Sequence, residues 1–226
     1  MQLAKLKPLP ISELPLPARG LFAALSKTEQ EEFLKHFRIR SLPSGKHLVR
    51  AKERAESFFV VLKGSLEVSR SKSGKSMVLN HVSEGDVVGE ISALGEMQRT
   101  ADVICVTPCI VAEIPVAQFH EKLLEFPNFA AFIMKSLALR LSRSTDLLVG
   151  LATEDVPSRV LQVLRTLVSG SVLDGDDFQL VRERPSHIEL ARMVGTSREV
   201  VGRALRLLEQ AGEIQQEGKQ IFVRPL

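Results

Sequence analysis

The chain lacks several features that define whole classes of protein. It has only two cysteines in 226 residues, Cys105 and Cys109, so a disulfide framework is excluded. They could face each other across a hairpin, but two reduced, buried thiols are favoured. No apolar run approaches the ~20 residues that a membrane span needs. The proline-rich residues 1–25 lack a continuous apolar secretory signal and are interpreted as a leader arm. We therefore expect a cytoplasmic protein that contacts no membrane.

The chain also lacks a large excess of charge of one sign and recognisable catalytic groups. The 30 basic and 27 acidic residues give a net charge of +3, which does not by itself indicate nucleic-acid binding. The five histidines show no metal-ligand spacing, and there is no activated nucleophile or P-loop. We therefore predict no metal, no catalytic residue and no enzyme. The local distribution differs, because residues 182–206 hold six arginines and three glutamates. This stretch is either a solvated basic face or a surface for phosphate.

Residues 26–127 predict a β-barrel domain. Seven short apolar runs are separated by turn residues such as Lys63-Gly64, Glu84-Gly85 and Thr107-Pro108. Many short strands at regular spacing are typical of an antiparallel sandwich or barrel. The runs cover residues 47–50, 57–62, 65–70, 76–82, 86–90, 101–106 and 109–114.

Residues 128–153 predict one long helix that pairs with a second copy. The helix contains no proline, and a seam with spacing 4, 3, 4, 3, 4 runs along it. Such heptad spacing is typical of helices that pair, although a helix packed on its own barrel would also fit. The seam residues are Ile133, Leu137, Arg140, Ser144, Leu147 and Leu151. The two polar residues at its centre suggest a fixed register or a contact with something held between the helices.

Residues 154–226 predict a winged helix-turn-helix. Asp155 and Pro157 suit the start of a helix after a hinge. Ser186 with Glu189 forms a capping-box pattern that opens a helix with Ile188, Leu190, Ala191 and Val194 on its inner face. A second helix begins after Thr196 or Ser197 and ends near Gly212. The alternation from Ile214 to Val223 then predicts a hairpin. A short turn between two helices, followed by a β-ribbon, describes the winged motif.

The second of these helices carries the outward residues Ser197, Arg198, Glu199 and Arg203 near its start. A recognition helix reads bases with its N-terminal part in the major groove. Arginine suits the two acceptors of guanine, and glutamate accepts from the cytosine amino group. A helix that only bound phosphate would gain nothing from Glu199, unless this residue merely favours the helix N-terminus. We therefore predict sequence-specific binding of double-stranded DNA.

The segment VGTSREVVGRALRLLEQAGEI, residues 194–214, resembles the recognition unit of the cyclic-AMP receptor protein family of bacterial transcription regulators. The resemblance implies that Arg198, Glu199 and Arg203 touch bases in each half of a two-fold operator of the TGTGA type. It also implies a homodimer through residues 128–153 and contact with RNA polymerase.

The segment DVVGEISALGEMQRTADV, residues 86–103, places a glutamate and an arginine nine positions apart among small residues. Considered alone, Glu90 and Arg99 could form a structural ion pair in a loop. The other possibility is a binding site for a small cyclic anion, because arginine binds phosphate and glutamate accepts a hydrogen bond from a ribose hydroxyl. Glycine lets backbone N–H groups approach such a ligand, and a helical turn at 90–94 would present its N-terminus.

This segment is similar to the phosphate-binding cassette of cyclic-nucleotide-binding domains, and VVLKGSLEV, residues 60–68, resembles the strand pair that precedes it. The resemblance assigns Gly89 and Glu90 to the ribose and Arg99 and Thr100 to the phosphate. It also assigns backbone near Ile91 and Ser92 to the ring, and matches Arg140 to a family arginine. Ser144 and Thr145 align with the two residues that contact adenine, one from each subunit.

The fold class predicted is α+β, with an N-terminal cyclic-nucleotide-binding jelly-roll barrel, a long dimerisation helix and a C-terminal winged helix-turn-helix. The function implied is a transcription regulator that cAMP activates allosterically. The loop AKERAES, residues 51–57, departs from the family pattern of Gly-Asp or Gly-Glu. Two alternatives of the same fold remain: an effector-independent regulator, or a sensor of cyclic di-GMP or haem. A regulatory subunit without a DNA role is a rival that residues 186–212 oppose.

Overall fold

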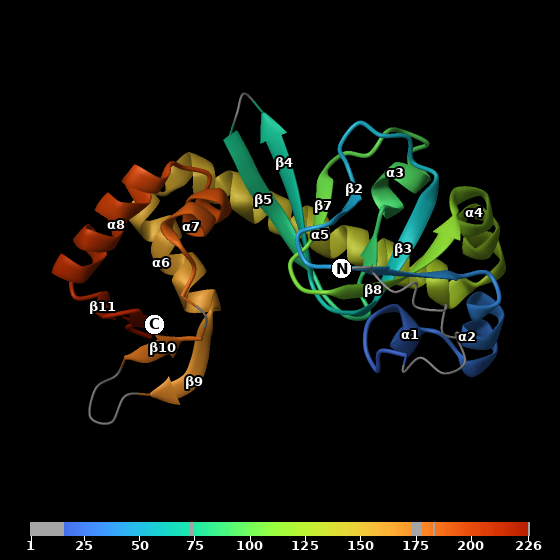
Figure 1. The fold of residues 1–226 in the computed structure, drawn as a ribbon, viewed down its shortest axis with the longest axis horizontal. Helices are drawn as coiled ribbons and strands as arrows, with labels where there is room; N and C mark the ends of the chain where they lie inside the picture. The colour runs from blue at the N-terminus through green and yellow to red at the C-terminus, as the bar shows by residue number, and fades with distance from the viewer. Residues whose placement is uncertain (1–15, 73–74, 173–177, 183, 226) are drawn as a thin grey trace, which may run out of the picture. The chain divides into compact units, whose positions relative to one another are not determined.

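A computed structural model describes residues 16–72, 75–172, 178–182 and 184–225 (Figure 1). Its contacts divide the chain into two units. One unit runs to Arg70 and resumes at Leu79–Leu141, and the other comprises Ser71–Val78 with Ser142–Leu226. The predicted leader arm lies mostly outside the described residues. Its last part, however, is folded: Leu21, Phe22 and Leu25 are buried.

Two four-stranded antiparallel sheets form the barrel, with strand orders β1-β8-β3-β6 and β2-β7-β4-β5. All seven predicted apolar runs contain a strand. Strand β1 was not predicted, because Ile39 and Leu42 are its only apolar residues and do not alternate. The strands are β1 (Arg38–Leu42), β2 (His47–Val49), β3 (Ser57–Lys63), β4 (Leu66–Lys72), β5 (Lys75–Val82), β6 (Val87–Val88), β7 (Asp102–Cys105) and β8 (Cys109–Pro115).

Strand β3 separates two hydrophobic clusters. Side chains alternate between the faces of a strand, so Phe58 and Val60 join one cluster while Phe59 and Val61 join the other. Both faces are covered, which explains why residues 58–62 of β3 are all apolar. The second cluster fills the barrel and includes both cysteines.

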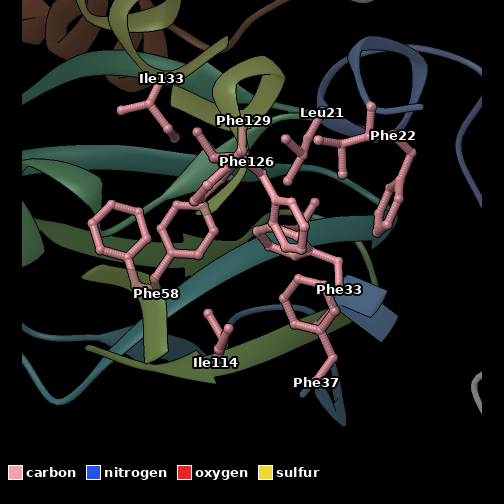
Figure 2. Close-up of a cluster of buried hydrophobic side chains, with 14 of the residues drawn as sticks. Leu21, Phe22, Phe33, Phe37, Phe58, Ile114, Phe126, Phe129 and Ile133 are labelled. Atoms are coloured by element: carbon pink, nitrogen blue, oxygen red, sulfur yellow. The ribbon is translucent and has the colours of Figure 1, made fainter. Parts of the chain in front are cut away.

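The first cluster lies between the sheet and the helices and is dominated by phenylalanines (Figure 2). The ring centroids of Phe33 and Phe129 are 4.6 Å apart, and those of Phe58 and Phe119 are 4.7 Å apart. Such packing fixes the helices against the barrel. They are α1 (Leu21–Ala24), α2 (Lys27–Leu34), α3 (Glu90–Leu94), α4 (Val116–Glu125) and the start of α5 (Pro127–Thr153).

In helix α5, the residues that begin the predicted seam do not face a partner helix. Ile133 is 2% exposed in the first cluster, and Leu137 packs against the same cluster. These residues face the chain's own barrel, so the prediction that they face a partner helix is wrong. A parallel stripe one residue further along is exposed and keeps the heptad spacing: Met134, Ala138, Leu141, Thr145, Leu148 and Ala152.

The C-terminal part of the second unit has the predicted helix-turn-helix. Helix α6 (Val156–Thr166) begins at Asp155, whose side chain accepts from the Ser158 N–H at 2.9 Å. Helix α7 (His187–Val194) has the predicted capping box between Ser186 and Glu189. Ile188 does not lie on its inner face as predicted, because its side chain is 56% exposed. Helix α8 (Arg198–Gln210) follows after a turn at Gly195, where φ is 71°.

The predicted hairpin is the pair β11 (Ile214–Glu217) and β12 (Gln220–Val223). It belongs to a four-stranded sheet of order β11-β12-β10-β9, whose other strands are β9 (Val168–Val172) and β10 (Gln179–Val181). These two strands were not predicted: β9 (VSGSV) contains only two apolar residues, and β10 has three residues. Together the sheet and three helices confirm the winged helix-turn-helix.

Candidate ligand site and nucleic-acid interface

The segment 86–103 folds as strand β6, a glycine, helix α3, a loop and strand β7. Gly89 is the pivot, with a left-handed φ of 89°. A Cβ at this position would lie 2.5 Å from Nη1 of Arg99 and 3.3 Å from the Ser57 carbonyl oxygen. Glycine is therefore required both by the backbone conformation and by the close approach of Arg99.

A cavity of about 40 Å³ lies beside this pivot. Its lining includes seven of the nine predicted ligand residues, namely Gly89, Glu90, Ile91, Ser92, Arg99, Thr100 and Arg140. The rest of the lining is apolar and comes from residues on or beside the barrel strands. Ligand pockets commonly measure roughly 300–1,000 Å³, so this cavity is much smaller than a typical ligand pocket.

Arg99 is buried, with 5% of its surface exposed. Its Nη2 donates to the Ser57 carbonyl at 2.5 Å, and its Nη1 donates to the Gly89 carbonyl at 3.4 Å. The guanidinium also lies 5.6 Å from the centroid of the Phe59 ring. Burial lowers the pKa of Arg99, and the charge of Glu113 is the largest effect in the opposite direction. A guanidinium has five N–H donors, so these two bonds leave capacity for an anion.

Glu90 is fully buried and is paired with Arg140 of α5. The Arg140 Nη1 lies 2.5 Å from Oε1 of Glu90, and Arg140 Nη2 donates to the Val87 carbonyl at 2.7 Å. Burial raises the pKa of Glu90, and the charge of Arg140 opposes that rise. The other carboxylate oxygen, Oε2, is buried without a hydrogen-bond partner in the part of the chain that the structure describes. That oxygen can accept a hydrogen bond from a hydroxyl group.

The remaining predicted ligand residues differ in exposure. Ser92 is 3% exposed and Ile91 is 40% exposed, while Thr100 is half-buried. Ser144 and Thr145 are exposed residues of α5 in the second unit. Their contact with a ligand stays a prediction.

Apolar cavity residues were absent from the sequence prediction: Val49, Val68, Val88, Ala101 and Val103 also line the cavity. They lie on or beside β2, β4, β6 and β7. The alternation of the strands marks them as inward-facing, but it does not indicate which inward residues border a cavity.

Helix α8 presents the four predicted DNA residues at its start. Ser197 is the N-cap, and its hydroxyl accepts from the Val200 N–H at 3.4 Å. Arg198, Glu199 and Arg203 are exposed. The opposite face is buried through Val201, Ala204, Leu205 and Leu208. The hydrogen bond from Ser197 lowers the pKa of Glu199.

Comparison with known proteins identifies both regions. The family model of the cyclic nucleotide-binding domain matches residues 39–126, and the family model of the Crp-like helix-turn-helix domain matches residues 158–225. The chain is 35% identical over 199 residues to the cAMP-activated global transcriptional regulator CRP of Pasteurella multocida, covering 85% of this chain and 93% of that protein. The chain belongs to the cyclic-AMP receptor protein family. It is therefore a DNA-binding transcription regulator with a cyclic nucleotide-binding domain.

Two further relatives agree with this assignment. The cAMP-activated global transcriptional regulator Vfr of Pseudomonas aeruginosa is 30% identical over 202 residues, which cover 85% of this chain and 92% of that protein. The solved structure of the c-di-GMP-responsive global regulator CLP of Xanthomonas campestris has a TM-score of 0.77 and 26% identity. This match covers 89% of this chain and all of that one.

No helix in the described ranges is long and apolar enough to span a membrane. Within the same ranges, no group of three or more His, Cys, Asp and Glu side chains has a metal-binding arrangement.

Proposed function

We propose that this regulator binds DNA as a homodimer and that cAMP switches its affinity for a palindromic operator. The observation that carries the proposal is that a buried cation and a buried hydrogen-bond acceptor line the same cavity. Arg99 offers a guanidinium, and Glu90 offers a carboxylate oxygen that is buried and without a hydrogen-bond partner among the described residues. A ribose 3′,5′-cyclic phosphate has a matching anion and hydroxyl.

The proposed binding step follows from these contacts. The phosphate binds Arg99 and Thr100, and the 2′-hydroxyl donates to Glu90. Charge-assisted hydrogen bonds of this kind are roughly twice as strong as neutral ones. The cavity of about 40 Å³ is proposed to widen, and Arg140 is the lining residue that belongs to α5. Ligand binding therefore acts on the long helix.

The dimer is proposed to form along the exposed stripe of α5. Met134, Leu141 and Leu148 are 64%, 71% and 66% exposed. Apolar residues at heptad spacing are buried when two helices pair. In the paired state, Ser144 and the partner's Thr145 are proposed to contact adenine, so the ligand favours one geometry of the helix pair. The end of α5 at Thr153 and the cap at Asp155 form the proposed hinge.

In the favoured geometry, the two α8 helices lie about 34 Å apart and enter successive major grooves. Arg198, Glu199 and Arg203 read the bases, and RNA polymerase is the proposed partner at the promoter. The relatives named above support this role, since their names describe cAMP-activated transcriptional regulators.

Cyclic di-GMP is a second candidate ligand, because the similar structure of CLP comes from a c-di-GMP-responsive regulator. Calorimetric titration of the purified protein separates the two. We expect heat from cAMP at micromolar concentration, and its loss in Arg99→Leu. Heat from cyclic di-GMP alone would favour the second candidate. No heat from either, with specific DNA binding intact, would contradict ligand control at this cavity.

A further inference from the structure

The guanidinium of Arg99 is held on the side of strand β3. Its Nη2 donates to the main-chain carbonyl of Ser57, the first residue of β3. Ser57 does not line the cavity, yet it fixes the arginine that does.

The side chain of Ser57 continues the chain of contacts to strand β8. Its hydroxyl donates to Oε1 of Glu113 at 2.6 Å. Oε2 of Glu113 lies 3.4 Å from Nη1 of Arg40 on β1. The side chain of Glu113 is 21% exposed and that of Arg40 is 41% exposed. Since exposed ion pairs are weak, Arg40 neutralises Glu113 incompletely.

Glu113 also acts on Arg99 through its charge. Burial is the largest influence on the pKa of Arg99 and lowers it. Of the carboxylates that act in the opposite direction, Glu113 has the largest effect, ahead of Glu53, Glu90 and Glu56. A buried cation needs compensating charge. Glu113 does not line the cavity, but the Ser57 hydroxyl that donates to it belongs to the residue whose carbonyl holds Arg99.

We propose that Glu113 is the counter-ion that stabilises Arg99 before a ligand binds, and that it competes with an anionic ligand for this arginine. A bound phosphate compensates the same guanidinium that Glu113 compensates. Part of the attraction of Glu113 is therefore redundant once the phosphate is bound, and the carboxylate repels the phosphate as well. Glu113 is a positioning residue that limits affinity. The competition with a ligand, which is the ligand half of this inference, rests on the proposed function.

The first test is the affinity of Glu113→Gln for cAMP by calorimetry. The amide oxygen can still accept from the Ser57 hydroxyl, so geometry is retained while the charge is lost. We expect binding about 3- to 10-fold tighter than in the wild type, since a like charge near the phosphate is removed. Adenosine, which lacks the phosphate, should bind no more tightly. Glu121→Gln is the matched control, because Glu121 is an exposed residue of α4. Unchanged or weaker cAMP binding, or an equal gain for adenosine, would overturn the competition.

The second test needs no ligand. Thermal unfolding of the wild type, Glu113→Gln, Arg99→Met and the double variant forms a double-mutant cycle. We expect Glu113→Gln to lower the melting temperature in the wild type and to have a much smaller effect in the Arg99→Met background. Equal effects in both backgrounds would overturn the counter-ion role. If the wild type bound no cAMP, the proposed function and the ligand half would fail, and the cycle would still decide whether Glu113 stabilises Arg99.

Discussion

Arg140 Nη1 lies 2.5 Å from the Glu90 carboxylate, although the two residues are fifty positions apart in the chain. This ion pair joins the start of the ligand cassette to the long helix. A ribose hydroxyl therefore has two ways to bind Glu90: it uses the buried oxygen Oε2, or it displaces Arg140. Only the second changes a contact of α5, and it would link ligand binding to the helix that is proposed to form the dimer.

The buried Glu90 predicts a specific pH dependence of stability. Burial raises its pKa in the folded protein, so the folded state keeps the proton to higher pH than the unfolded state. The contribution of Glu90 to stability is present below the ordinary carboxyl pKa of about 4.3, and is lost as pH rises through the raised pKa. Glu90→Gln should therefore gain stability relative to the wild type across that range. Urea unfolding at a series of pH values measures the difference, and parallel profiles for the two proteins would contradict the prediction.

The exposed stripe of α5 predicts a variant that separates the dimer. Leu148→Glu places a charge in the proposed contact between two helices, so the dimer should dissociate at micromolar concentration. Sedimentation velocity measures the change in mass. Leu124→Glu is the matched control, because Leu124 is 91% exposed on α4. A Leu148→Glu protein that stays dimeric, or a monomeric wild type, would show that this stripe is not the interface.

The position of this stripe shows what the sequence left open. Ile133 and Met134 begin two heptad patterns that lie about 100° apart on the helix, and both patterns are mostly apolar. Periodicity predicted the helix and its pairing, but it does not decide which face packs on the barrel. The phenylalanine cluster around Phe129 determines which face packs on the barrel. This cluster is assembled from distant parts of the chain.

The candidate site was predictable where local sequence determines geometry. The helical turn at 90–94, the cap at Asp155 and the capping box at Ser186 each follow from short-range rules, and the structure contains all three. The bond from Arg140 to Glu90 and the contact of Glu113 with Ser57 were not predictable, since they join strands and helices that only the fold brings together.

The recognition helix predicts a sequence-dependent loss on substitution. Arg198→Ala should cost about 1–3 kcal/mol of binding free energy at the cognate operator and relax the choice of one base pair. Its cAMP affinity should equal that of the wild type. Fluorescence anisotropy with the operator and with a scrambled duplex measures both losses. Equal weakening on the two duplexes would assign Arg198 to phosphate contact instead.

The two cysteines should be inert in the folded protein. Cys105 and Cys109 are 1% and 2% exposed. Burial, with a smaller effect of the neighbouring Cys109, raises the pKa of Cys105 to about 12. The reactive thiolate of Cys105 is therefore scarce at neutral pH. A colorimetric thiol reagent should label both residues only in denaturant, and rapid labelling of the native protein would show that this part of the barrel opens readily.

The most direct test of the account is the affinity for operator DNA with and without saturating cAMP, measured for the wild type and for Arg99→Leu. Allosteric coupling of typically about 1–3 kcal/mol predicts that cAMP tightens operator binding by the wild type roughly 5- to 150-fold. By reciprocity, operator DNA should tighten cAMP binding by the same factor. Arg99→Leu should fold, bind the operator weakly and ignore cAMP. Equal operator affinity of the wild type with and without cAMP would contradict the account.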